Sequence, residues 1–182
     1  MNTGELILIL GGARAGKSSF ALRLAGERKT ASPHRVCFIA TAEALDDEMQ
    51  ARIERHRAER PPDWLTIEEP KRLDEALKQA GGAEVVIVDC LTLFVSNWLV
   101  AARDGQACEE DITQVIETFL ADAQKSGQTI ICVSNEVGLG LVPDTPLGRA
   151  FRDALGKVNQ RLAEAATQVY LLVAGLPLRM KG

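Results

Sequence analysis

The sequence lacks features that would point to two common classes of protein. It has no excess of basic residues, since 25 acidic residues outnumber 21 lysines and arginines and the formal charge is −4. This balance argues against a general affinity for nucleic acid or for an anionic membrane. Its first apolar run, residues 6–10, is too short for a signal peptide or a membrane span. We therefore expect a cytoplasmic protein that binds no nucleic acid and has no membrane span.

The cysteines lack the spacing of metal-binding or redox motifs. Four are present, Cys37, Cys90, Cys108 and Cys132, and no two of them form C-x-x-C. Three lie in or beside apolar runs that are typical of buried strands. We expect buried free thiols rather than disulfides or metal ligands.

No internal repeat, low-complexity tract or interdomain linker interrupts the 182 residues. A chain of this length can form one sizeable core and is short for two, so we predict a single domain over residues 1–182. Near-continuous apolar runs predict strands at 5–10, 35–40, 84–89, 128–134 and 168–174. Helical patterns between these runs predict helices at 17–28, 45–59, 71–80, 91–103, 109–126 and 147–166.

This alternation of strands and helices predicts an α/β fold in which a mostly parallel sheet is covered by helices on both faces. Ligands of such folds bind at the carboxyl ends of the strands. Residues 134–151 contain three glycines and two prolines, which predict a long loop after the fourth strand. Long ordered loops in compact domains are often functional.

The strongest motif is a phosphate-binding loop (P-loop), residues 11–18. Its sequence GGARAGKS places Gly11, Gly16, Lys17 and Ser18 at the spacing G-x-x-x-x-G-K-S, between a predicted strand and a predicted helix. Glycines let successive backbone N–H groups face one concavity, and the helix N-terminus adds the positive end of its dipole. We predict that this loop holds a polyphosphate, that Lys17 reaches its β- and γ-phosphates, and that Ser18 ligates Mg²⁺.

A carboxylate at the end of a second buried strand would complete such a site. Asp89 follows the apolar run VVIV, and we expect it to act on the magnesium ion or its water shell. The alternative role for an aspartate in this position is to cap the next helix.

A P-loop does not by itself distinguish a kinase from a nucleotide-dependent switch or an ATP-driven machine. A GTPase switch is disfavoured because Asp89 is followed by CLT instead of the D-x-x-G pattern. In addition, the segment SNEVG has Glu136 where the guanine motif N-K-x-D has lysine. For Asn135 and Glu136, contact with substrate or base and simple bracing of the loop are both open.

A histidine in an arginine-rich segment raises the question of a second reaction. Leu45, Met49, Ile53 and His56 fall on one face of a predicted helix. A histidine there is more often a packing or surface residue. A neutral imidazole nitrogen can nevertheless attack phosphorus, and nearby arginines can disperse the charge that develops. The arginines around His56 are Arg52, Arg55, Arg57 and Arg60.

Four segments occur in this order: GGARAGKS, FIATAEALDDEMQARIERHRAERP, VVIVDCLTLFVSNWL and VSNEVGLGLVPDTPLGRAFRDALGKVNQRLA. Together they resemble the bifunctional adenosylcobinamide kinase/adenosylcobinamide-phosphate guanylyltransferase family of cobalamin biosynthesis over nearly the whole chain. The resemblance implies a RecA-like P-loop NTPase fold and two reactions. A nucleoside triphosphate, ATP or GTP, phosphorylates the aminopropanol hydroxyl of adenosylcobinamide. GTP then donates GMP to adenosylcobinamide phosphate, which gives adenosylcobinamide-GDP and pyrophosphate.

The resemblance also implies roles for individual residues. The family's guanylylated histidine matches His56, which joins Lys17 of the P-loop motif as a predicted catalytic residue. Some relatives carry two adjacent histidines where this chain has Arg55 before His56, and several carry glutamate where it has Asp89. Ser18 and Asp89 are the metal ligands expected from the P-loop and from the end of the second buried strand, and the resemblance leaves open whether Asp89 contacts the metal or the nucleotide. The implied nucleotide contacts are Gly11, Gly12, Ala13, Arg14, Ala15, Gly16, Lys17, Ser18, Ala40, Thr41, Ala42, Arg57, Ala58, Glu59, Arg60, Glu68 and Asp89.

The resemblance further implies a homo-oligomer, commonly a trimer, with adenosylcobinamide and its phosphate as partners. One nucleotide pose does not obviously serve attack at both the γ- and the α-phosphate. We therefore hypothesise that residues 45–64 move between the two steps, since this segment is rich in arginine and ends at Pro61-Pro62. A kinase without the transferase step, and a nucleotide-dependent switch or binding module, are the alternatives.

Overall fold

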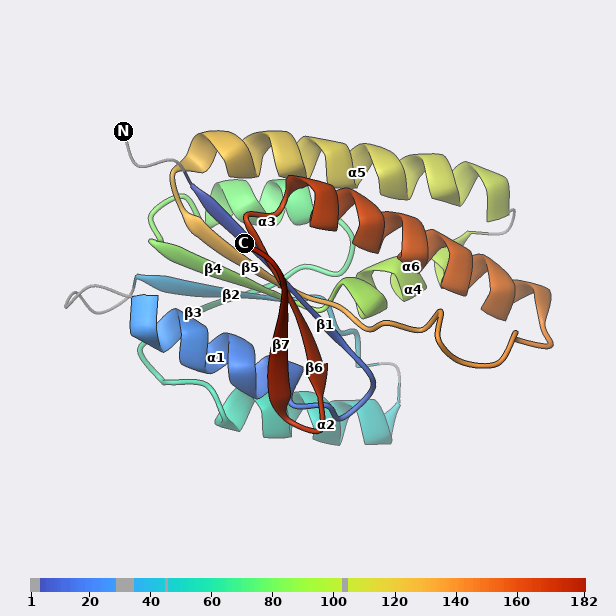
Figure 1. Cartoon of the computed structure of the whole chain (residues 1–182), viewed down its shortest axis with the longest axis horizontal. Coiled ribbons are helices and arrows are strands. Elements are labelled where there is room, and N and C mark those ends of the chain that lie inside the picture. The colour runs from blue at the N-terminus through green and yellow to red at the C-terminus, as the bar shows by residue number, and fades with distance from the viewer. Residues whose placement is uncertain (1–3, 29–34, 45, 103–104) are drawn as a thin grey trace.

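The computed structural model describes residues 4–28, 35–44, 46–102 and 105–182, the side chains of 105–108 aside. Within these residues seven strands form one sheet in the order β3-β2-β4-β5-β1-β6-β7 (Figure 1). Every neighbouring pair is parallel except β6 and β7. The strands are β1 (Glu5–Gly11), β2 (Val36–Ala40), β3 (Leu65–Glu68), β4 (Val85–Asp89), β5 (Thr129–Val133), β6 (Gln168–Val173) and β7 (Leu176–Lys181).

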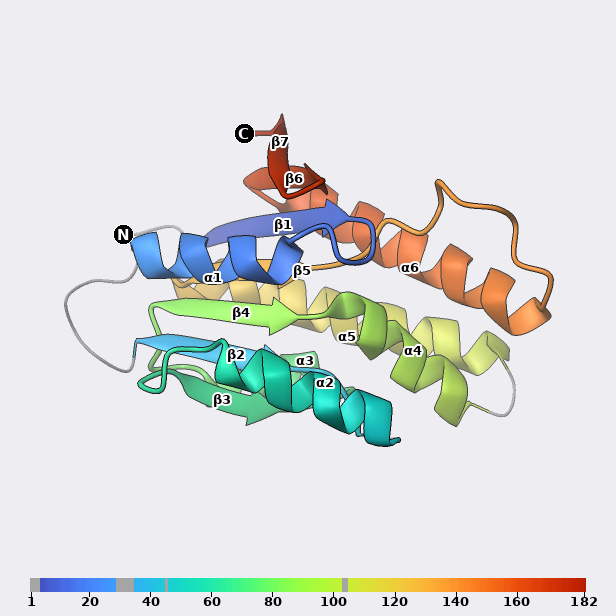
Figure 2. The same ribbon diagram turned by 90° about the horizontal axis from the view of Figure 1, so that it is seen from below.

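Helices cover both faces of this sheet. Figure 1 and Figure 2 show α3, α4, α5 and α6 on one face and α1 and α2 on the other. The helices are α1 (Lys17–Arg28), α2 (Asp47–Ala58), α3 (Leu73–Gln79), α4 (Leu91–Ala101), α5 (Gly105–Ser126) and α6 (Pro146–Ala165). No helix in the described parts of the chain is both long and apolar enough to cross a membrane.

The sheet separates two apolar cores, and this explains why its central strands are apolar without interruption. On β1, Leu8 lies in the core beneath α3 to α6, while Ile9 lies in the core beneath α1. Alternate residues of a strand point to opposite faces, so a strand that is buried on both sides needs apolar residues throughout. The predicted α/β fold, with a mostly parallel sheet and helices on both faces, is confirmed.

Helix α2 is attached less firmly than the others. None of its residues is fully buried. Met49, Ile53 and His56 are half-buried on one side, as their spacing predicts, and the remaining described positions are exposed. Asp46 caps the helix by accepting a hydrogen bond of 2.7 Å from the Met49 amide. Leu45, which was expected on the same face, lies outside the described residues.

The sequence did not predict the two edge strands β3 and β7. β3 is only four residues long and is preceded by two prolines. β7 contains Pro177, which a sheet tolerates at an edge because proline cannot donate a ladder hydrogen bond. A two-residue turn, Ala174-Gly175, joins β6 to β7, and its φ angles of 52° and 81° suit the turns that favour tight hairpins.

The predicted loop at 134–151 overlaps the predicted helix at 147–166. The helix is confirmed and the last six residues of the loop are wrong, because α6 begins at Pro146. Proline is favoured in the first turn of a helix, where its missing N–H costs nothing. Thr145 caps this helix by accepting a hydrogen bond of 3.1 Å from the Gly148 amide. Pro146 and Gly148 therefore belong to a helix start. Helix α5 likewise begins at Gly105, four residues before its predicted start.

Candidate nucleotide-binding site

The P-loop connects β1 to α1, as its motif predicts. Gly11 ends the strand with φ 153°, and a Cβ atom there would lie 2.6 Å from the Leu172 carbonyl oxygen of the neighbouring strand. Gly16 has φ 89°, a conformation that side chains rarely adopt. Arg14 also has a positive φ, of 58°, although it is not glycine. The glycine spacing is thus required by the close approach of β6 and by the turn into α1.

Segments on both sides hold the P-loop in place. The Glu136 amide, just after β5, donates to the Gly11 carbonyl at 3.2 Å. The Gly175 amide, at the tip of the β6–β7 hairpin, donates to the Ala15 carbonyl at 3.1 Å. The loop therefore keeps its shape through bonds to strands on either side of β1.

Lys17 is buried at the first residue of α1. Its Nζ atom donates to the Gly12 carbonyl at 2.6 Å, so the side chain folds back over the loop. Burial lowers the pKa of Lys17, while nearby Cys90 and Asp89 oppose this shift and Arg52 adds to it. A phosphate in the loop would supply this buried cation with the anionic partner that favours its charged form.

Asp89 lies opposite the P-loop at the end of β4. Burial of its carboxyl group raises its pKa, and this shift is opposed by a hydrogen bond from the Ser18 hydroxyl and by the charges of His56, Arg60 and Lys17. The carboxylate therefore lies near Lys17 on α1, His56 on α2 and Arg60 in the segment that follows α2. Lys17, Ser18 and His56, which sequence analysis named as catalytic or metal-binding, therefore all act on this carboxylate.

Ser18 and Asp89 have the donor chemistry that Mg²⁺ requires. The ion takes oxygen ligands and is usually held by one or two protein groups together with waters and substrate phosphates. In the described parts of the chain, no three histidine, cysteine, aspartate or glutamate side chains converge on one point. A magnesium ion would therefore need oxygen atoms of the nucleotide to complete its coordination.

His56 and Arg60 bring the second predicted segment to the same place. They lie one helical turn apart in sequence, His56 near the end of α2 and Arg60 just beyond it, and both are half-buried. The Arg60 guanidinium lies over the Phe38 ring, with its Cζ atom 3.7 Å from the ring centre. Its Nε atom is buried and has no hydrogen-bond partner among the described residues. Arg60 thus has a free donor beside Asp89.

The remaining predicted contacts divide into two groups. Strand register places Glu68, Ala40 and Asp89 in one row across β3, β2 and β4. Arg57 joins this row through an exposed ion pair of 3.8 Å with Glu68. Ala58 and Glu59, in contrast, are exposed at the end of α2. Ala13 and Arg14 are also exposed on the P-loop, whose backbone rather than side chains would face a phosphate.

Cys90, which lies near Lys17 and Asp89, is a second potential nucleophile. Burial, together with nearby Asp89, raises the pKa of its thiol to about 11, so it stays protonated near neutral pH. Cys37, Cys90 and Cys132 are all free, as the sequence predicts, and the side chain of Cys108 lies outside the described residues. His56 is thus a better candidate nucleophile than the cysteine beside Lys17.

Sequence analysis missed the residues that hold the loops after β2 and β3 in place. The buried Asn97 side chain, on α4, donates to the Thr41 carbonyl at 2.8 Å and to the Pro70 carbonyl at 3.2 Å. The next residue, Trp98, donates through Nε1 to the Lys71 carbonyl at 3.2 Å. An asparagine within an apolar helical pattern is a detectable signal, because a buried amide needs polar partners. The pattern did not say which loops those partners belong to.

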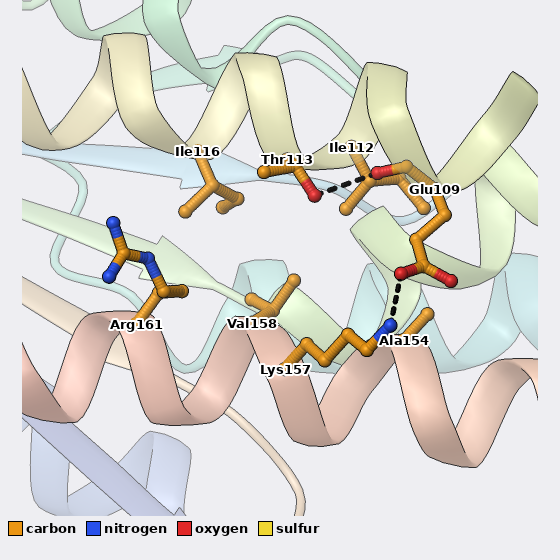
Figure 3. A pocket seen from close by; sticks show the side chains of 8 residues that line it. All are labelled: Glu109, Ile112, Thr113, Ile116, Ala154, Lys157, Val158 and Arg161. Atoms are coloured by element: carbon orange, nitrogen blue, oxygen red, sulfur yellow. Dashed lines mark hydrogen bonds and ion pairs between the residues drawn. The ribbon is translucent and has the colours of Figure 1, made fainter.

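A separate groove lies between α5 and α6 (Figure 3). Its walls are mainly apolar, and an ion pair between Glu109 and Lys157 joins the two helices beside it. Both helices belong to the layer on the face opposite α1 and α2 (Figure 1). This groove is therefore not part of the site around Lys17 and Asp89.

Two solved structures resemble the fold at low sequence identity. One is the flagellar accessory protein FlaH from Methanocaldococcus jannaschii, with a TM-score of 0.55 and 17% identity over 100% of this chain and 80% of that chain. The other is the KaiC-like protein PH0186 from Pyrococcus horikoshii OT3, with a TM-score of 0.54 and 14% identity over 93% of this chain and 71% of that chain. At such identities the likeness concerns the fold alone, and it agrees with the P-loop NTPase fold expected from the sequence.

Three curated proteins are similar over nearly their whole length. Bifunctional adenosylcobalamin biosynthesis protein CobU from Escherichia coli K12 is 42% identical, and the protein of the same name from Salmonella typhimurium LT2 is 39% identical. In each case 97% of this chain and 99% of the relative are covered. Bifunctional adenosylcobalamin biosynthesis protein CobP from Pseudomonas aeruginosa PAO1 is 44% identical over 96% of both chains.

The family model described as cobinamide kinase / cobinamide phosphate guanyltransferase matches residues 7–180, which include the P-loop, α2 and Asp89. With this match and with three full-length relatives, the chain belongs to the cobinamide kinase / cobinamide phosphate guanyltransferase family.

Proposed function

We propose that residues 1–182 form one catalytic unit that carries out both reactions named for its family at the site around Asp89. The observation that supports this most directly is the convergence of two separate motifs on that carboxylate. Ser18 and Lys17 approach it from the P-loop, while His56 and Arg60 approach it from α2 and the residues after it. A simple kinase needs the first motif and has no use for the second.

In the kinase step, the P-loop amides and Lys17 hold the triphosphate of ATP or GTP. The aminopropanol hydroxyl oxygen of adenosylcobinamide attacks the γ-phosphorus and its proton passes to water. The bond to the β-phosphate oxygen breaks, and the nucleoside diphosphate leaves. Lys17 and the start of α1 stabilise the negative charge on the transferred group. Mg²⁺, held by Ser18, Asp89 and the nucleotide's own oxygens, would add further charge stabilisation.

In the transferase step, His56 attacks the α-phosphorus of GTP. A nitrogen–phosphorus bond forms and pyrophosphate leaves, which the P-loop is suited to bind. The phosphate oxygen of adenosylcobinamide phosphate then attacks the same phosphorus. The nitrogen–phosphorus bond breaks, so His56 is regenerated and adenosylcobinamide-GDP is formed. Arg60 lies beside this centre with an unpartnered Nε donor that can stabilise the charge on the α-phosphate.

The chain itself argues against the two simpler functions. A kinase without the transferase step does not explain why α2 directs His56 toward the site. A switch or binding module is disfavoured by the lack of the D-x-x-G and N-K-x-D motifs. The contacts expected of Ala40, Thr41, Ala42, Arg57 and the other residues named from the resemblance are part of the same proposal.

A homo-oligomer, in the form of a trimer, is also part of this proposal. The edge strand β7 offers a surface for it, because Leu178 and Met180 are exposed on a strand whose outer edge has no neighbour in the described sheet. Sedimentation or light scattering of the purified protein tests this assembly directly.

Labelling of the protein by GTP tests the proposed function. The protein is incubated with Mg²⁺ and GTP labelled at the α-phosphate, without corrinoid, and the expected result is acid-labile, base-stable label on the chain. His56→Ala should abolish the label, while His34→Ala, which changes the chain's other histidine, should leave it unchanged. No label despite demonstrated GTP binding would contradict the transferase half, and phosphorylation of adenosylcobinamide by the same preparation would then leave a kinase alone.

A further inference from the structure

Two exposed apolar segments flank the P-loop. One is the loop of residues 134–145 between β5 and α6, in which Leu139, Leu141 and Val142 are 85%, 96% and 66% exposed. The other is the tip of the β6–β7 hairpin, where Val173 and Leu176 are 60% and 73% exposed. Single exposed apolar residues need no explanation, whereas clusters of them mark sites of interaction.

Both segments are joined to the P-loop itself. The strand order β5-β1-β6 puts the loop after β1 between them. Glu136 bonds to Gly11 on one side and Gly175 bonds to Ala15 on the other. Figure 1 and Figure 2 agree in showing the P-loop between the hairpin tip and the loop that leads into α6. The P-loop, where the triphosphate would bind, therefore lies between the two exposed apolar segments.

The 134–145 loop is held in a defined shape. At its start, the Ser134 hydroxyl donates to Asn159 at 2.6 Å and the Asn159 amide group donates to the Asn135 carbonyl at 3.0 Å. At its end, Nη1 of Arg149 donates to the carbonyls of Pro143 and Asp144, each at 2.9 Å. These bonds fix both ends of a segment whose apolar side chains point into solvent.

We propose that these two segments, Leu139 to Val142 and Val173 with Leu176, form an apolar platform that binds the corrin ring of the acceptor. This inference rests on the proposed function. The reacting hydroxyl sits on a short aminopropanol arm and must reach the γ-phosphate at the P-loop. The bulky macrocycle that carries the arm must then rest on whatever surface surrounds the P-loop. The ring carbons and methyl groups of that macrocycle are apolar and can pack against the exposed side chains on both sides.

A second copy of the chain is the competing occupant of these side chains. It fits less well, because the platform borders the P-loop on two sides, and a protein surface seated there would close the route of a large acceptor. The exposed residues further along β7, Leu178 and Met180, lie away from the P-loop and suit a contact between copies.

The test compares Leu141→Gln and Leu176→Gln with Leu65→Gln. Leu65 is also exposed, at 50%, but it begins β3 and so lies at the end of the sheet opposite the P-loop. Binding of adenosylcobinamide is measured by equilibrium dialysis and visible absorbance, in the presence of Mg²⁺ and a non-hydrolysable GTP analogue. GTP binding, label transfer from GTP to the enzyme, and mass by light scattering are recorded for each variant.

The expected result is a loss of corrinoid affinity of about tenfold in each platform variant, as for one large apolar side chain removed from a contact. GTP binding, label transfer and mass should match those of the unchanged protein, and Leu65→Gln should match it in every measurement. Unchanged corrinoid affinity in both platform variants would overturn the proposal, as would a change in mass without a change in affinity. If the unchanged protein takes label from GTP but does not bind adenosylcobinamide, the proposed acceptor fails and the platform with it.

Discussion

The Thr41 hydroxyl holds Cys90 by both of its backbone groups. It donates to the Cys90 carbonyl at 2.7 Å and accepts a hydrogen bond from the Cys90 amide at 2.8 Å. The Thr41 amide in turn donates to the Asp89 carbonyl at 3.2 Å. The peptide bond between Asp89 and Cys90 is cis. The Thr41 side chain, in the loop after β2, holds the backbone at Cys90, next to the residue that carries the Asp89 carboxylate.

Thr41→Val should lower the free energy of unfolding by about 2 kcal/mol, because two backbone groups lose their partner while the shape of the side chain is kept. Both transfer reactions should also slow, since the backbone that orients Asp89 is released. Urea denaturation and initial-rate assays measure the two effects. Thr41→Ser retains the hydroxyl and should behave nearly as the unchanged protein, and equal stability of the valine variant would show that the double hydrogen bond contributes little.

Lys17→Ala should reduce both phosphorylation and guanylylation by about 10²- to 10³-fold, as when a group that stabilises transition-state charge is removed. Both reactions use the triphosphate that Lys17 contacts, so both should slow. Rates of phosphate transfer to adenosylcobinamide and of label transfer from GTP provide the measurement. Ser19→Ala, two residues along and exposed, is the matched control. Retention of either reaction in the Lys17 variant would place its nucleotide outside the P-loop.

Sequence patterns predicted the parts of the fold that are buried on both faces. The apolar runs that became β1, β2, β4 and β5 are mostly buried, and the run that became β6 is partly buried beside β1. The edge strands β3 and β7 have one exposed side or more, so their sequences resemble loops. Pro177 in particular argues against a strand unless one already knows that it lies at an edge. The hairpin turn was likewise hidden, because Ala174 is not a usual residue for a positive φ.

The sequence likewise predicted only those residues of the candidate site that lie in local motifs. The P-loop motif and a strand-terminal aspartate are local signals, so Lys17, Ser18 and Asp89 could be found from the sequence. His56 could be placed on a helical face, but its nearness to Asp89 depends on how α2 packs, and the resemblance rather than the pattern identified it. The bracing contacts of Asn97 and Thr41 join residues that are 27, 49 and 56 positions apart in the sequence. No spacing rule reports such contacts.

Asp89→Asn should make the nucleotide-free protein more stable at neutral pH. Burial raises the pKa of Asp89 above its value in the unfolded chain, so the folded protein binds this proton more tightly. The contribution of Asp89 to the free energy of unfolding is then fully present below its ordinary pKa and is lost as the pH rises through the folded-state pKa. Ser18, His56, Arg60 and Lys17 reduce this effect without reversing it.

Urea denaturation of Asp89→Asn and of the unchanged protein, repeated from acidic to neutral pH without nucleotide, measures this difference. The stability gained by the variant should grow as the pH rises, while both transfer activities in Mg²⁺ should be largely lost. Parallel stability curves over the whole range would show that burial does not raise the pKa of Asp89 in the folded protein. Retained activity would show that Asp89 has no part in holding the metal or the nucleotide.

GTP should protect α2 from trypsin. The helix carries Arg52, Arg55 and Arg57, and none of its residues is fully buried, so it can leave the protein surface at little cost. If His56 and the arginines contact the triphosphate, each release of α2 must also release that contact. At a ligand concentration ten times the dissociation constant, cleavage within α2 should slow by about tenfold.

Arg161, on the well-packed helix α6, provides an internal control site whose cleavage should not change. Peptide mapping with a GTP analogue that cannot transfer GMP separates binding from covalent labelling. Identical cleavage of α2 with and without the analogue would argue against movement of residues 45–64 between the two reactions.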